Sequence, residues 1–145
     1  MEVLMLLSIL RNLTNVLACL LFANSVYADD IGANIRGDGN DLTIVQAGVG
    51  LSTTWVNMIG DSNTANISQK DSGNHNIFLD LIGNNHSATI LQQGSGDHSA
   101  VVILDGDQPW NFDLTQSGAT SQSYSSSTNG TCNAIGGCNL TVNQQ

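Results

Sequence analysis

Short segments in which apolar residues occupy alternate positions recur along most of this chain. The first covers residues 40–46, where Leu42 and Ile44 are two positions apart and Gln46 ends the segment. Because successive side chains of a strand point to opposite faces, this two-residue period predicts β-strands. Seven-residue segments of the same kind follow, each ending in glutamine, at 63–69, 86–92, 110–116 and 138–144. The chain is therefore predicted to be all-β.

The spacing of these glutamine strands is regular. The first four start 23, 23 and 24 residues apart, and the fifth follows after a small insertion. Between them lie companion strands, predicted at 52–58, 75–81, 98–104 and 122–128, and glycines recur in the links. A period of this length is typical of a solenoid. We expect a parallel β-solenoid of about five rungs, starting near residues 40, 63, 86, 110 and 138, in which two parallel sheets face each other.

The first, third, fifth and seventh residues of each glutamine strand share the inward face. A single glutamine buried there without partners would cost about 1 to 3 kcal/mol. Amides stacked at a strand spacing of about 4.7 Å can instead bond to the amides above and below, which predicts a side-chain ladder. The predicted ladder residues are Asn40, Gln46, Asn63, Gln69, His86, Gln92, Gln116 and Gln144. The predicted core residues are Leu42, Ile44, Ile67, Ile90, Phe112, Leu114, Leu140 and Val142.

The companion strands carry a second apolar column, on their outward face. Trp55, Phe78 and Val101 occupy the central position of successive companion strands. Stacked one rung apart, they predict an apolar stripe that binds a partner subunit or bundles fibres side by side. The last companion strand, 122–128, has only Tyr124 to bury, so we expect the last rung to fray.

The N-terminus has the features of a secretory signal peptide, residues 1–28. Arg11 precedes a short apolar stretch, and small residues precede a cleavage site that we place after Ala28. A lipoprotein signal around Cys19 is an alternative. Residues 29–39 are then expected to form a short polar leader before the solenoid, residues 40–145. Both ends of the solenoid are expected to be uncapped.

Charge and cysteine content narrow the choice of partners and compartment. From Asp29 onward the chain has 11 Asp, one Arg and one Lys, a net charge of −9. Such a surface repels phosphate groups, so nucleic acid is not an expected partner. Cys132 and Cys138 are expected to form a disulfide in an oxidising compartment, with two free thiols as the alternative.

Side chains capable of catalysis are present but are not grouped as an enzyme would need. The aspartates fall on outward strand positions or in turns, where we expect solvated charges. The narrow interior leaves no cavity for a small-molecule substrate, so we expect no enzymatic activity, metal or cofactor. His75 and His98, one rung apart, are expected to stack, and protonating both is expected to lower stability below about pH 6.

The repeat resembles the curlin family, the secreted amyloid subunits of bacterial curli fibres. The resemblance rests on the pattern of polar residue, x, apolar, x, apolar, x, Gln, x, Gly, which is clearest in NDLTIVQAG at 40–48 and WNFDLTQSG at 110–118. This chain differs from the usual pattern in having Met58, Leu81 and Leu104 at the ends of companion strands that usually end in glutamine. The resemblance implies export through an outer-membrane secretion pore and assembly on a nucleating minor curlin subunit.

From the repeat and the resemblance together we expect a secreted structural subunit. It would self-assemble into extracellular, curli-type amyloid fibres, or fimbriae, at the cell surface, with a role in biofilm matrix and cell adhesion. The alternative is a monomeric, non-polymerising β-solenoid adhesin module.

Overall fold

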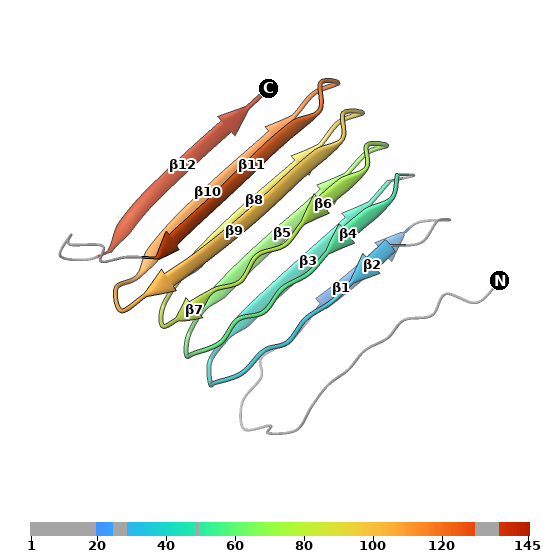
Figure 1. Cartoon of the computed structure of the whole chain (residues 1–145). Helices are drawn as coiled ribbons and strands as arrows, with labels where there is room; N and C mark the ends of the chain where they lie inside the picture. Colours follow the sequence, from blue (N-terminus) through green and yellow to red (C-terminus); the bar gives the residue numbers. More distant parts are fainter. Residues whose placement is uncertain (1–19, 25–28, 49, 130–136) are drawn as a thin grey trace.

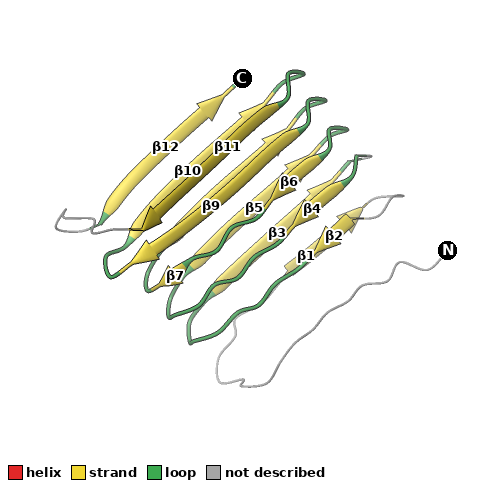
Figure 2. Ribbon diagram, in the orientation of Figure 1, coloured by secondary structure: helices red, strands yellow, loops and turns green. Residues whose placement is uncertain are grey.

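The protein is a two-layered solenoid of β-strands (Figure 1). The computed structural model describes residues 20–24, 29–48, 50–129 and 137–145. Within these ranges the chain forms strands, turns and loops but no helix, so it contains no helix that could span a membrane (Figure 2). The predicted fold class, an all-β solenoid with two facing parallel sheets, is confirmed.

The five predicted glutamine strands lie side by side in one sheet, the glutamine sheet. Neighbouring strands are parallel and pair in the register that the repeat predicts, so that Ile44, Ile67, Ile90 and Leu114 lie in one row. A sixth strand, from the N-terminal segment, pairs with the first of them. In spatial order the strands are β1 (Leu20–Asn24), β3 (Asp41–Ala47), β5 (Thr64–Lys70), β8 (Ser87–Gln93), β10 (Trp110–Ser117) and β12 (Cys138–Gln144).

The companion strands form the opposing sheet, which is also parallel. Its members in spatial order are β2 (Asp29–Ile31), β4 (Ser52–Thr54), β6 (His75–Ile77), β9 (His98–Gly106) and β11 (Gln122–Asn129). A short strand, β7 (Ile82–Gly83), pairs with the end of β9. The described residues thus make four complete rungs from β3 to β11, and β12 begins a fifth.

Two companion strands are shorter than predicted. β4 and β6 stop after three residues, whereas we expected strands as far as Met58 and Leu81. These two residues have left-handed backbone conformations, with φ of 60° and 48°, which a continuous strand does not allow. Both side chains are nevertheless fully buried, so packing holds the backbone in this conformation. In the next rung β9 runs without interruption past Leu104.

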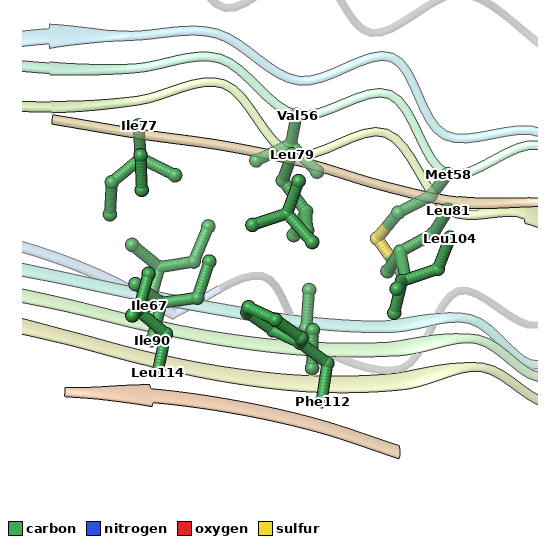
Figure 3. Packing of buried hydrophobic residues seen from close by; sticks show 14 of the residues in the cluster. Val56, Met58, Ile67, Ile77, Leu79, Leu81, Ile90, Leu104, Phe112 and Leu114 are labelled. Atoms are coloured by element: carbon green, nitrogen blue, oxygen red, sulfur yellow. The ribbon is translucent and has the colours of Figure 1, made fainter. Parts of the chain in front are cut away.

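The core fills the narrow space between the sheets (Figure 3). Ile67, Ile90 and Leu114 project from the glutamine sheet toward side chains of the companion sheet. Burying one such side chain stabilises the fold by about 1.5 to 3 kcal/mol. The predicted core residues of the first four rungs are at most 3% exposed. The companion strands and the segments that follow β4 and β6 add a second set: Val56, Met58, Ile77, Leu79, Leu81, Ala100, Val102 and Leu104.

The N-terminal part of the solenoid differs from the prediction. Residues 29–39 are not a separate polar leader, because β2 pairs with β4 and backbone hydrogen bonding to the next rung continues as far as Asp38, whose carbonyl oxygen accepts the N–H of Ser62. Ile31 and Ile35 pack against the core. The segment is mostly polar, but these two isoleucines are four residues apart, a spacing that places both on the same face of a strand.

β1 lies inside the predicted signal peptide, residues 1–28. It pairs with β3, with Ala23 in register with Gln46. Ala28 and the rest of that segment are outside the described residues, so the signal peptide and its cleavage stay predictions. Cleavage after Ala28 would remove β1 and leave β2 as the first strand.

The last two strands differ from the prediction in two ways. The backbone pairing of β11 is more complete than expected, and the side chains of β12 are less buried. β11 pairs with β9 along its whole length, so the expected fraying is absent from the backbone pairing. In β12, Leu140 and Val142 are only partly buried, although both were predicted to be core. The reason is that no companion strand faces β12 among the described residues.

Candidate functional site

The glutamine column forms a continuous ladder along the solenoid. Each side-chain amide donates from Nε2 to Oε1 of the glutamine in the next rung. The four distances are 2.9 Å from Gln46 to Gln69, 3.1 Å from Gln69 to Gln92, 2.9 Å from Gln92 to Gln116 and 2.8 Å from Gln116 to Gln144. Every bond joins neighbouring strands of one sheet, so the ladder ties the rungs together in one register.

The second proton of these amides points across the core. In four of the glutamines Nε2 also donates to a backbone carbonyl of the companion sheet, an interaction that sequence reasoning missed. The acceptors are the carbonyl oxygens of Thr53, Asn76, Ser99 and Ser123, at 3.2, 3.0, 3.1 and 3.4 Å. The ladder therefore holds the two sheets together as well as the rungs, and this role could not be inferred from spacing within one strand.

A threonine hydroxyl joins the ladder in its first rung. Thr54 Oγ1 accepts from Gln46 Nε2 at 3.2 Å and donates to Gln69 Oε1 at 2.5 Å. Thr54 is 1% exposed and occupies an inward position of β4 that is apolar in the next two rungs. The only signal for this role in the sequence is that polar residue in an otherwise apolar column.

The ladder is incomplete at both ends. At the N-terminal end Gln46 Oε1 is buried and has no hydrogen-bond partner, although β1 lies beside it. At the C-terminal end Gln144 is only partly buried. One end therefore has an unused acceptor, and the other has the amide group of the last glutamine, which no further rung covers among the described residues.

A second ladder runs along the start of the glutamine strands. The side-chain oxygen of Asn40 accepts the backbone N–H of Asn63 at 2.9 Å, and that of Asn63 accepts the backbone N–H of His86 at 2.9 Å. His86 continues the series, because its Nδ1 accepts the backbone N–H of Trp110 at 3.1 Å. The predicted ladder residues at this position are thus confirmed as hydrogen-bonded neighbours.

His86 acts as a substitute for asparagine in this ladder. With Nδ1 as acceptor, the proton of the neutral ring is on Nε2, which faces the carbonyl oxygen of Ile82 at 3.0 Å. Burial lowers the pKa of His86 below its usual value of 6.5, and the carbonyl contact only partly offsets this effect. Protonation at Nδ1 would replace the bond from Trp110 with a repulsion between two donors.

His75 and His98 stack as predicted, on neighbouring companion strands. The ring centroids are 5.2 Å apart and the rings are parallel within 2°. Each Nε2 contacts a backbone carbonyl, of Lys70 at 2.7 Å and of Gln93 at 3.0 Å. Each Nδ1 is buried without a hydrogen-bond partner. Burial lowers the pKa of His75, His98 lowers it further, and Asp71 and Asp97 raise it.

We expect the folded protein to lose stability as the pH falls below about 6.5. Because His75 and His86 have lowered pKa values in the folded state, the unfolded chain binds protons first. The free energy of unfolding should be constant above about pH 7 and decrease as the pH falls from 6.5 toward the lowered values. Asp80, whose pKa is raised by burial, has the opposite effect nearer pH 4.

The measurement is the denaturant midpoint at pH 7.5 and pH 5.5. His75→Gln should reduce the difference between the two midpoints, and glutamine is the natural residue of this column at Gln122. As a control, Asn76→His places a histidine at an exposed position of the same strand and should leave the difference unchanged. An unreduced pH dependence in His75→Gln would contradict the prediction.

Comparisons with protein-family models, curated proteins and solved structures give no match.

Carboxylates and amides of the turns form further columns. Asp61 Oδ1 accepts the backbone N–H of Asp38 at 2.8 Å, and Asn84 Oδ1 accepts that of Asp61 at 2.7 Å. At the other turn, Asp97 Oδ1 accepts the backbone N–H of Asn74 at 3.0 Å. These aspartates were expected to be solvated charges only. They are exposed, but they also satisfy backbone donors of the preceding rung, which only the stacking of turns makes possible.

The predicted outward stripe lies just past the ends of β4 and β6 and on β9. Trp55 is 49% exposed, and Phe78 and Val101 are partly buried. The indole of Trp55 covers Gly32 of the preceding rung so closely that a methyl group on that glycine would overlap the ring. The stripe ends at Ser125, which pairs with Val101. Its role as a lateral or partner surface stays a prediction.

Cys138 is disulfide-bonded. Its predicted partner, Cys132, lies outside the described residues, so this pairing stays a prediction. Within the described ranges no group of three or more His, Cys, Asp or Glu side chains could hold a metal ion.

Proposed function

We propose that the protein is a secreted structural subunit of the curlin type that self-assembles into extracellular amyloid-like fibres of the biofilm matrix. The observation that carries this proposal is the glutamine ladder, which runs along the solenoid axis and is incomplete at both ends. A ladder that ends in unused hydrogen-bonding groups favours continuation by a further rung. The curlin-like repeat supports the same conclusion.

The edges of the two sheets supply the mechanism. β11 and β12 each pair with only one neighbour among the described strands, so the other side of each presents unpaired backbone N–H and C=O groups. Such edges favour addition of a strand from another chain. An incoming copy gains backbone hydrogen bonds and an extended amide ladder in the same step. Growth along the axis then repeats the contacts that already join one rung to the next.

The test is assembly of the purified protein as recovered after export. Monomeric protein incubated at neutral pH is expected to form unbranched fibres in electron micrographs. The fibres should bind amyloid dyes and give a diffraction spacing of about 4.7 Å along the axis. Addition of sonicated fibres should remove the lag phase. A stable monomer that seeds do not convert would contradict the proposal and would favour the monomeric adhesin module.

A further inference from the structure

The strands at the two ends of the glutamine sheet occupy equivalent positions. β1 pairs with the outer edge of β3, at the same level as β2 of the companion sheet. β12 pairs with the outer edge of β10, and no companion strand faces it among the described residues. If β1 is absent, β2 is a companion strand that no glutamine strand faces. Each end is then half a rung: the N-terminal end has only the companion strand, and the C-terminal end has only the glutamine strand.

β12 fits the outer edge of β3 in the register of the repeat. Leu140 and Val142 pair with Phe112 and Leu114 of β10, positions that correspond to Leu42 and Ile44 in β3. Leu140 and Val142 are only partly buried, as are Ile31 and Ile35, the apolar residues of the half rung at the other end. Joining the two ends would cover both pairs in one closed rung.

The polar groups match as well. Gln46 Oε1 is buried without a partner in the presence of β1, whose residue in register there is Ala23. β12 brings Gln144 to the same register position, and the amide of each preceding glutamine already donates to the next one. The unused acceptor of one copy and the last amide of another would therefore extend the ladder without a break.

Charge favours this pairing of unlike ends. No charged side chain occurs between residues 114 and 145, so β12 carries none. The opposite end carries Asp29, Asp30, Asp38 and Asp41 against a single cation, Arg36. Two N-terminal ends brought together would repel, whereas an N-terminal and a C-terminal end would not.

We propose that β12 of one copy replaces β1 at the β3 edge of the next copy and closes a composite rung with β2 of that copy. This inference rests on the proposed function and adds the orientation in which subunits join and the step that permits joining. Subunits join head to tail in one orientation, and the joint forms only after β1 has left. Removal of residues 1–28 therefore acts as the step that makes a subunit competent to accept another.

Cross-linking within fibres tests the register of the joint. One batch of protein carries Thr43→Cys and a second carries Thr141→Cys, both at positions in one outward column of the glutamine sheet. Adjacent parallel strands bring such residues within the Cα separation of about 4.4–6.8 Å that a disulfide requires. Both are expressed with their own N-terminal segment in an exporting host, and N-terminal sequencing identifies chains that begin at Asp29. The batches are mixed, assembled and oxidised.

The mixed fibres should yield a disulfide between positions 43 and 141, identified by mass spectrometry. Asn139→Cys, two residues out of register, should give at least tenfold less cross-link with Thr43→Cys. The full chain with residues 1–28 retained should give neither cross-link. Fibres without the 43–141 cross-link, or its formation with β1 retained, would overturn the inference and leave the proposed function standing. Absence of fibres in all batches would instead contradict the proposed function.

A second variant tests the ladder across the joint. Gln144→Leu removes the amide that would reach Gln46 Oε1 and should slow elongation on wild-type seeds about tenfold, equivalent to about 1.4 kcal/mol. Gln145→Leu makes the same change at the exposed neighbouring residue and should elongate like wild type. Equal elongation rates for the two variants would count against a ladder that continues from copy to copy.

Discussion

Replacing Gln92 by leucine is expected to lower the free energy of unfolding by about 3 kcal/mol or more, because several buried groups lose their partners together. Gln92 Oε1 accepts from Gln69, and its Nε2 donates both to Gln116 and to the carbonyl oxygen of Asn76. Leucine fills a similar volume but can satisfy none of these groups. The loss should appear as a lower denaturant midpoint of the soluble subunit and as slower fibre formation.

Gln93→Leu is the matched control. It makes the same substitution one residue further along β8, where the side chain is on the outward face of the sheet. Its effect should stay within about 0.5 kcal/mol, as for most surface substitutions. Equal stability of the two variants would show that the amide ladder contributes nothing beyond the apolar core.

Gly94→Ala is expected to destabilise the protein far more than Gly118→Ala. The two glycines occupy the same turn in successive rungs and have nearly the same φ, 110° and 108°. At Gly118 the nearest atom to an added Cβ, the backbone C of Gln145, is 3.9 Å away. Only the cost of the left-handed conformation, about 1 to 2 kcal/mol, applies there. At Gly94 the added Cβ would also overlap the carbonyl oxygen of Gly118.

The overlap at Gly94 should also weaken a hydrogen bond between neighbouring turns. The carbonyl oxygen of Gly118 accepts the backbone N–H of Gly96 at 3.0 Å. Moving the carbonyl away from a Cβ at position 94 would break this bond and separate two rungs. Hydrogen exchange of the Gly96 amide should therefore be much faster in Gly94→Ala than in Gly118→Ala. Similar stability and similar exchange in the two variants would contradict the close approach of the turns.

The glutamine sheet was predictable from the sequence because its geometry follows from two local regularities. A two-residue apolar period specifies which face of a strand is buried, and a constant interval of 23 or 24 residues specifies which residues become neighbours. Together they predicted the pairing of Ile67 with Ile90 and a hydrogen bond between the side chains of Gln69 and Gln92. The stacking of His75 on His98 followed from the same interval.

Interactions across the core and at the ends depended on the tertiary structure. The left-handed turns at Met58 and Leu81 are backbone conformations held by packing, which an alternating pattern does not encode. The hydrogen bonds from glutamine side chains to companion-sheet carbonyls have backbone acceptors. Because the backbone carbonyl is the same at every residue, the sequence does not indicate which one accepts. The position of β1 beside β3 also required the folded chain, because residues 20–24 lie outside the repeat.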